Sequence, residues 1–448
     1  LGEAAVDARA LAFAVGAAVI AALLGGVGHA WQVTRGNVSD ALGDGGRSAS
    51  PGRASVRARR VLVVSELALA VLLLAGAGLF VRSLQRLQAV SPGFTKEGVL
   101  TAAVKPAGVA DDRTRRLALF DRIRADVAAL PGVRVAALTS RLPLTGPGRG
   151  GPFSVEGRPF DPQSSIPTFA VYRSVSPEYH AAMQVSVRRG RGLSAQDAAG
   201  TPTVAVINET LARGFFGGGD PIGQRIKLGA PGSPRPWLTV VGITADVHDR
   251  ALALPSSPEI AVPLAQDPPE SVVIVARTAG APLALVPQVQ AVVRKADPTV
   301  PLSDVRTLDR IVADSVAGRR SPALLLAGFA LLAVTLAGLG TYGVMSYAVS
   351  GRAHEMGVRM ALGARPGDVA RLVVGEGLVL ALAGAAIGLG GAAAAGRALS
   401  SLLFEVRPAD PLTFTLAAAA LVVVATAACT RPALRAARVD PAVALREE

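Results

Sequence analysis

Cysteine is almost absent from this sequence of 448 residues, which contains Cys429 alone. A disulfide framework is therefore excluded. A Cys/His metal site is not expected either, because the four histidines lie far apart, at His29, His180, His248 and His354. Aromatic residues make up only 4%, and the sequence has no aromatic-rich basic motif of the kind that binds RNA. The net charge of +13 consequently does not predict a nucleic-acid partner, since the arginines gather beside apolar stretches.

The sequence motifs of common active sites are also missing. No G-x-x-x-x-G-K-[ST] loop is present to hold the phosphates of ATP, and neither G-x-S-x-G nor H-E-x-x-H occurs. The glycine clusters at 146–151 and 217–219 lack the following lysine and are interpreted as turns. We therefore predict no catalytic residue, no cofactor and no metal, and we do not expect the chain to be an enzyme.

Apolar runs are what the sequence has in abundance. Half of its residues are hydrophobic, and five stretches are nearly free of charge: 11–28, 61–81, 323–349, 372–395 and 411–429. About 20 apolar residues in a helix cross a hydrocarbon core of roughly 30 Å. These stretches predict an integral membrane protein. The alternative, buried core helices of a large soluble domain, requires five such stretches to arise without a membrane.

The placement of arginine predicts the orientation of these helices. Lys and Arg in short loops tend to remain on the cytoplasmic side of a membrane. Arginines are dense in 47–60, 350–371 and 431–446, whereas the loop between the last two apolar stretches carries only Arg397 and Arg407. We therefore expect those three segments in the cytoplasm and the long segment between the second and third stretches outside.

That long segment has the pattern of a soluble α+β domain. Strand-like runs occur at 99–104, 133–138, 204–207, 238–243 and 272–276. Apolar residues at three-to-four spacing predict helices at 115–130 and 284–296, and Pro131-Gly132 and Asp297-Pro298 end them. The predicted fold is a membrane α-helical bundle with a large α+β extracytoplasmic domain inserted between the first and second spans of one half of the protein, which are the second and third apolar stretches.

A weak internal repeat suggests how the chain is divided. Residues 29–45, after the first apolar stretch, and 431–448, after the last, share a basic turn, a valine and an Ala-Leu pair. We therefore interpret 1–31 as the last span of a preceding half of the protein and 32–60 as a cytoplasmic linker. A span is expected at 61–82, the outer domain at 83–320 with a β-rich insertion at about 150–265, and three spans with a cytoplasmic tail at 321–448.

The segment 350–371 is the most informative local feature. An apolar stripe alternates there with charges, and Gly363 to Pro366 form a turn before the next span. A solvated loop and a short helix that docks a soluble partner explain this pattern about equally well. Two acids, Glu66 and Glu376, lie near the ends of apolar stretches and are expected to extend their carboxylates to water. Gly384-x-x-x-Gly388 fits either a close-packing helix face or a compositional bias.

Three motifs give the chain a family resemblance. The run YAVSGRAHEMGVRMALGA at 347–364 resembles the cytoplasmic loop of MacB/FtsX-type ABC transporter permeases. The run PALRAARVDPAVALR at 432–446 resembles that family's terminal motif. In the outer domain, 204–228 and 238–249 resemble the MacB-like periplasmic core domain. The arrangement is similar to that of large two-half permeases.

The resemblance implies a function, partners and a site. It implies a permease in the bacterial inner membrane that couples ATP hydrolysis by a separate ABC ATPase to movement of the outer domain, for export of a peptide, antibiotic or lipid-linked cargo. The alternative is a signalling membrane protein that regulates a periplasmic partner such as a cell-wall hydrolase. Other implied partners are a second permease half or an identical copy, a periplasmic adaptor and membrane lipid. The expected ATPase-coupling residues are Arg352, Glu355, Gly357, Arg359, Ala361, Gly363 and Ala364.

Overall fold

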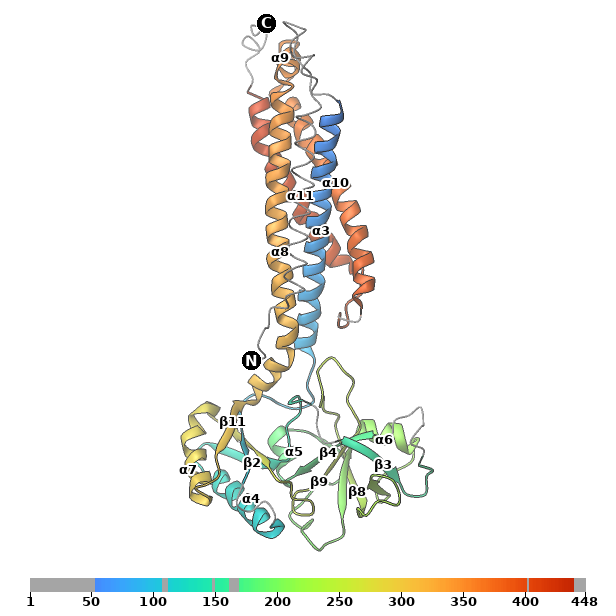
Figure 1. Ribbon diagram of the computed structural model, residues 1–448, viewed down its shortest axis with the longest axis vertical. Helices are drawn as coiled ribbons and strands as arrows, with labels where there is room; N and C mark the ends of the chain where they lie inside the picture. Colours follow the sequence, from blue (N-terminus) through green and yellow to red (C-terminus); the bar gives the residue numbers. More distant parts are fainter. Residues whose placement is uncertain (1–52, 107–111, 147–149, 161–168, 401–402, 439–448) are drawn as a thin grey trace, which may run out of the picture. The chain divides into compact units, whose positions relative to one another are not determined.

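The computed structural model describes residues 53–106, 112–146, 150–160, 169–400 and 403–438 (Figure 1). The span expected at 1–31 and most of the linker expected at 32–60 lie outside the described residues. The chain from Val63 onward forms one compact unit, which contains long helices and a sheet domain.

Four long helices carry the remaining apolar stretches: α3 (Arg53–Ala89), α8 (Leu308–Ser350), α10 (Pro366–Ala398) and α11 (Pro411–Ala436). Each has an 18-residue window of mean hydropathy between 2.1 and 2.3 and is long enough to cross a membrane. This confirms the predicted membrane-capable helices in the described part of the chain. All four extend beyond their apolar stretches. At about 1.5 Å per residue, the 43 residues of α8 span about 65 Å, roughly twice a hydrocarbon core.

Glycines let α10 approach α3 closely. A Cβ atom at Gly384 would lie 2.6 Å from the Cβ of Leu67, and one at Gly388 would lie 2.9 Å from the Cβ of Val71. Real Cβ atoms do not approach so closely, so a larger residue at either position would push the two helices apart. The Gly384-x-x-x-Gly388 motif is therefore a packing face, which decides between the two interpretations that the sequence left open.

The segment between α3 and α8 forms an 11-stranded sheet with an open part and a closed part. In the open part, strands pair antiparallel in the order β11, β1, β10, β2. Helices α4 and α7 pack on it through buried residues such as Phe120, Ile123 and Val289 (Figure 1). The bounds are β1 (Val99–Val104), α4 (Arg113–Ala128), β2 (Val133–Thr139), β10 (Val272–Thr278), the short 3-10 helix η1 (Pro282–Leu285), α7 (Val286–Ala296) and β11 (Leu302–Thr307).

The closed part is a small barrel. Six strands follow one another in the order β4, β3, β7, β8, β6, β9, and β9 pairs back with β4. This closure leaves no free strand edge within the ring. Phe153, Ile207, Phe216 and Ile260 are among the residues that fill its core. The bounds are β3 (Gly150–Val155), β4 (Phe169–Val175), α5 (Tyr179–Met183), β5 (Val187–Gly190), β6 (Val204–Asn208), α6 (Glu209–Phe216), β7 (Arg225–Leu228), β8 (Trp237–Thr244) and β9 (Glu259–Pro263).

One hydrophobic cluster joins the ends of two long helices to the sheet. Leu87 of α3 and Leu308, Ile311 and Val316 of α8 belong to the same buried cluster as Val275 of β10. These three α8 residues and Val312 recur at helical spacing, so one face of the first turns of α8 packs against the sheet domain. Both helix ends therefore contribute to the core of the sheet domain.

Candidate functional site

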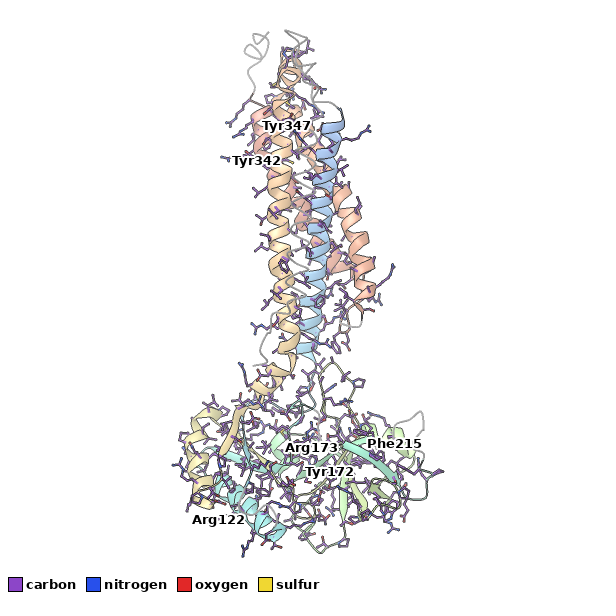
Figure 2. The ribbon with its side chains drawn as sticks, in the orientation of Figure 1. Arg122, Tyr172, Arg173, Phe215, Tyr342 and Tyr347 are labelled. Atoms are coloured by element: carbon purple, nitrogen blue, oxygen red, sulfur yellow. The ribbon has the colours of Figure 1, made fainter. Side chains whose placement is uncertain are left out.

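The segment that resembles the coupling loop contains a short helix, α9 (Ala353–Ala361), at the end of the helix bundle (Figure 1). Met356 is only 4% exposed and anchors α9 in a cluster with Val349 of α8, Val373 of α10 and Ala433 of α11. The short helix α9 is therefore held by α8, α10 and α11 together, and not by α8 alone. Figure 2 labels Tyr342 and Tyr347 in the part of α8 that leads to it.

The expected coupling residues divide into an exposed and an inward-facing group. Glu355 and Arg359 are exposed and form an ion pair of 2.7 Å one helical turn apart. Ala361 and Gly363 are exposed, and so is the intervening Leu362, whose exposed fraction of 82% is unusually high for a leucine. Gly363 has a φ of +98°, the left-handed conformation that glycine adopts without strain and that ends the helix.

The other three expected residues do not lie on that exposed surface. Gly357 is buried against the bundle, next to Met356, and Ala364 is half-buried. Arg352, also half-buried, forms an ion pair of 2.7 Å with Glu376 of α10. Glu376 thus has a cationic partner, whereas the sequence suggested that its carboxylate extends to water. Arg352, through its ion pair, and Gly357, through its burial, therefore hold α9 against the bundle.

The second acid of the apolar stretches, Glu66, has different surroundings. Its carboxylate lies against Gly340 of α8, where a Cβ atom would overlap it. Its Oε2 atom is buried and accepts no hydrogen bond from the described residues. Gly340 precedes the last residue of α8 by nearly three turns. The expectation that Glu66 extends to the helix end is therefore not met, and the missing side chain at Gly340 provides the space for its carboxylate.

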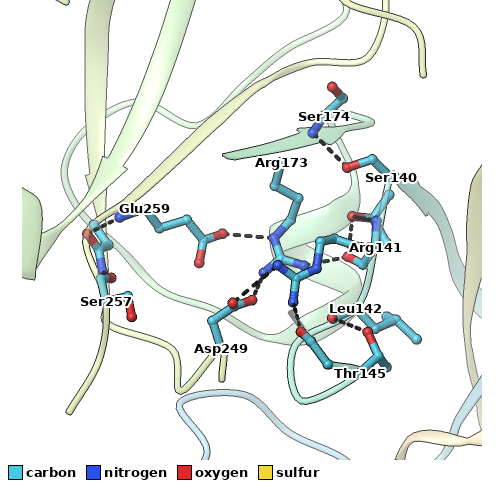
Figure 3. A network of polar contacts seen from close by, with 12 residues as sticks. Ser140, Arg141, Leu142, Thr145, Arg173, Ser174, Asp249, Ser257 and Glu259 are labelled. Carbon is cyan, nitrogen blue, oxygen red and sulfur yellow. Dashed lines mark hydrogen bonds and ion pairs between the residues drawn. The ribbon is translucent and has the colours of Figure 1, made fainter. Parts of the chain in front are cut away.

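In the sheet domain, a buried ionic network joins the open sheet to the barrel (Figure 3). Arg173 of β4 is fully buried and donates from Nη2 to Asp249 at 2.8 Å and from Nε to Glu259 at 2.9 Å. It also donates to the carbonyl of Arg141, which follows β2, and Arg141 lies 3.3 Å from Asp249. Removing one partner from such a network leaves a buried charge and costs about 3–5 kcal/mol. We assign this network a structural role.

Burial sets the protonation states beside that network. It lowers the pKa of Arg173, but Glu259, Tyr179 and Asp249 more than offset this and raise the pKa above its usual value. Burial, and then the positive charge of Arg173, lowers the pKa of His180 to about 4. His180 is therefore neutral at pH 7 and adds no second positive charge next to Arg173.

A further arginine fixes the connector between α3 and β1. Arg277 of β10 donates to the carbonyls of Ala182 at 2.7 Å, Glu97 at 2.9 Å and Thr95 at 2.7 Å. The connector amide of Thr95 also donates to the carbonyl of Met183 at 3.0 Å. The segment that leaves α3 is thereby attached to the sheet domain. Sequence analysis singled out neither Arg277 nor Arg173. The one signal available for each was a charged residue inside an otherwise apolar strand.

Comparison with known proteins identifies both regions of the chain. Residues 61–317, more than half of the chain, match the family model described as MacB-like periplasmic core domain. Residues 327–441 match the model described as FtsX-like permease C-terminal. Neither match includes residues 1–60.

Similar proteins carry export names. The probable syringafactin export ATP-binding/permease protein SyfD of Pseudomonas syringae is 27% identical, over 62% of this chain and 42% of that protein. The macrolide export ATP-binding/permease protein MacB of an Azoarcus strain is 30% identical, over 60% of this chain and 41% of that protein. The chain thus spans about two fifths of the length of these relatives.

Among solved structures, the periplasmic region of MacB from Actinobacillus actinomycetemcomitans is similar at 13% identity, with a TM-score of 0.34 over 49% of this chain and 92% of that one. The two family matches, which together extend from residue 61 to 441, agree with the order of the sheet domain and the last three long helices. The chain belongs to the family of ABC transporter permeases that combine a MacB-like periplasmic core domain with an FtsX-like permease region.

Proposed function

We propose that this chain is a permease half that transmits ATP-driven movement from a separate ATPase to its sheet domain. The observation that carries the proposal is the continuity of α8. Val349, near its end, packs in the cluster that holds α9, and Leu308, at its start, lies in the core of the sheet domain. No loop interrupts α8 between these two clusters, and Pro322 within it removes one backbone hydrogen bond. Displacement of α9 therefore reaches the sheet domain along one helix.

The membrane arrangement belongs to the same proposal. The sheet domain is inserted between the first and second spans of the half, α3 and α8, and lies on the outer face of the bacterial inner membrane. The arginine distribution supports this orientation, with α9 in the cytoplasm. The complete transporter then pairs this half with a second half or with an identical copy.

In this arrangement, α9 is the ATPase-docking element. Glu355, Arg359, Ala361 and Gly363 form the exposed surface that meets the ATPase, together with Leu362. Arg352, Gly357 and Ala364 support this surface from the bundle side. An exposed leucine beside small residues favours contact with a groove on a partner, because burying its side chain contributes about 1.5–3 kcal/mol.

Export is the activity that the relatives' names support. Those names mention a syringafactin, a macrolide and pyoverdine, and we propose a peptide, antibiotic or lipid-linked cargo for this chain, delivered to a periplasmic adaptor. Regulation of a periplasmic partner such as a cell-wall hydrolase is the second candidate. It is favoured by the core of the helix bundle, which apolar residues such as Leu67, Val71, Ala337 and Leu421 fill. Such a core suits transmission of movement better than passage of a polar molecule.

The test is purification of the intact protein with its native partners from membranes. We expect an ABC ATPase to accompany it, and the chain alone neither to bind nor to hydrolyse ATP. ATP turnover that persists after every accompanying ATPase has been removed would contradict the proposal, and so would the absence of any ATPase from the purified assembly. An adaptor among the partners supports export, and a hydrolase supports regulation.

A further inference from the structure

A cleft of about 290 Å³ lies where the two parts of the sheet domain meet. Arg113, at the start of α4, belongs to the open sheet, whereas Leu238 of β8 and Arg235 before it belong to the barrel. Tyr172 of β4, labelled in Figure 2 beside Arg173, lines the cleft between them. Ligand sites commonly occupy clefts of this kind between domains, from about 300 Å³ upwards, so this cleft accommodates a small molecule or one end of a larger one.

The polar groups of the cleft are cationic in balance. Arg235 lies over the ring of Tyr172, with its guanidinium carbon 5.8 Å from the ring centre. No hydrogen bond or ion pair joins Arg235 to another residue of the described ranges. Arg113 donates to the carbonyl of Gln266, which uses one of its five N–H groups. The one carboxylate of the lining, Asp267, accepts a hydrogen bond from the Tyr172 hydroxyl. Two guanidinium groups therefore face one carboxylate, leaving one positive charge unmatched.

Most of the remaining lining is apolar, and its other polar residues are Thr203 and Gln266. The apolar residues beside the two arginines are Leu228, Leu238, Val262, Pro234 and Pro236. A guanidinium group binds a carboxylate with two parallel hydrogen bonds, and leucine and proline walls favour an apolar body. This lining does not suit a highly charged anion such as a polyphosphate. Only one positive charge of the cleft is unmatched, and about half of the lining residues have no side-chain hydrogen-bond donor.

We propose that this cleft binds the carboxylate end of a short amphipathic peptide or acylated peptide. Arg235 and Arg113 hold the carboxylate, the ring of Tyr172 keeps Arg235 in place, and the apolar walls take the adjoining side chains. A ligand bound in this way contacts both parts of the sheet domain at once. The site does not depend on the ATPase-docking role of α9, because its occupancy is measured without nucleotide or ATPase.

The test is equilibrium dialysis of the full-length protein in lipid nanodiscs against radiolabelled N-acetyl-phenylalanyl-leucine, with empty nanodiscs as background. We expect saturable binding, and binding at least about tenfold weaker when the probe's carboxylate is replaced by an amide. Arg235→Gln is expected to weaken binding of the carboxylate probe about tenfold or more, the loss of one charge-assisted interaction. Arg235 is exposed, so this substitution does not disturb the core.

The matched control is Arg122→Gln, which removes the same charge from an exposed position on α4 (Figure 2). It is expected to bind the probe like the parent. The proposal is overturned if the carboxylate probe shows no saturable binding, if the amide binds equally well, or if Arg235→Gln binds like the parent. An equal loss in the Arg122 variant also overturns it, because attraction to the overall positive charge then explains the binding.

Discussion

Arg277 attaches the connector that follows α3 to the sheet domain, and the replacement of Arg277 tests this attachment. Arg277 is 8% exposed and donates three hydrogen bonds to main-chain carbonyls, two of them in the connector that follows α3. Glutamine at this position is too short to reach all three carbonyls. We therefore expect Arg277→Gln to release residues 90–98 from the sheet domain while the strands themselves remain paired.

The magnitude follows from the number of bonds. A hydrogen bond from a charged group contributes about 1.5–3 kcal/mol, and the lower value is appropriate because part of this region is accessible to water. Only the bonds to Glu97 and Thr95 join Arg277 to the connector, and together they amount to about 3 kcal/mol, which corresponds to roughly a hundredfold increase in local opening. Arg277→Lys keeps the charge but has a single donor nitrogen, so it is expected to lose about half of this free energy.

Hydrogen–deuterium exchange of the purified full-length protein measures this opening. The reporters are the amides of Thr95 and His248, which donate to the carbonyls of Met183 and Pro92, respectively, at 3.0 Å. Arg122→Gln, an exposed arginine on α4, is the control and is expected to change nothing. Parental exchange rates in Arg277→Gln, or equal acceleration in the control, would refute the role assigned to Arg277.

Three further predictions concern packing, topology and pH. Gly384→Leu should separate α10 from α3 and lower the thermal stability of the protein in detergent by about 2 kcal/mol or more, whereas Gly390→Leu, with open space at its Cβ, should not. A cysteine at Ser350 should react with an impermeant thiol reagent only after the inner membrane of spheroplasts has been opened, and labelling of intact spheroplasts contradicts the orientation. Because folding depresses the pKa of His180 from 6.5 to about 4, its contribution to stability is present above pH 6.5 and is lost as the pH falls toward 4. This loss is up to about 3 kcal/mol, and His180→Gln should remove it from the pH dependence of thermal unfolding. An unchanged pH dependence in this variant contradicts the assignment to His180.

The long helices were predictable because their defining property is local. An uninterrupted apolar stretch is enough to identify a membrane-capable helix, and the four described helices contain all four stretches after residue 53. Their ends were less predictable. The outer domain was expected to reach residue 320 and the apolar stretch to begin at 323, yet α8 starts at Leu308. The apolar spacing of Leu308, Ile311 and Val316 could have indicated this, since these residues pack against the sheet.

Strands were predicted only where they are long and rich in valine. The runs that became β1, β2, β6, β8 and β10 were found, with bounds that differ by two residues at most. Strand β3 was missed because its sequence begins Gly-Gly-Pro, which is typical of a turn, and β7 has only four residues. The closure of the barrel between β4 and β9 joins segments about 90 residues apart, so no local pattern could indicate it.

The short helix α9 was predicted as one of two alternatives, but the sequence did not indicate which of its residues are exposed. The alternation of charged and small residues located α9, and the family resemblance supplied its role. Which residues face outward depends on the cluster around Met356, to which α8, α10 and α11 all contribute. Gly357 was therefore assigned to the exposed surface although it is buried. Arg277 and Arg173 escaped notice because their partners come from distant strands and loops.

The central claim is that α9 receives the ATPase, and a charge-swapped helix tests it most directly. The double substitution Glu355→Arg with Arg359→Glu keeps the ion pair within α9, which contributes only about 0.3–0.5 kcal/mol, and reverses the charges that a partner meets. The control is Arg397→Glu, an exposed charge reversal in the last turn of α10. The measurement is recovery of the cognate ATPase with the permease, together with the stimulation of its ATP hydrolysis. We expect the swapped variant to lose both by about tenfold or more while the control retains them, because unmatched charges at a desolvated contact cost about 2–5 kcal/mol. If the swapped variant recovers and stimulates the ATPase like the parent, α9 is only a link between two spans.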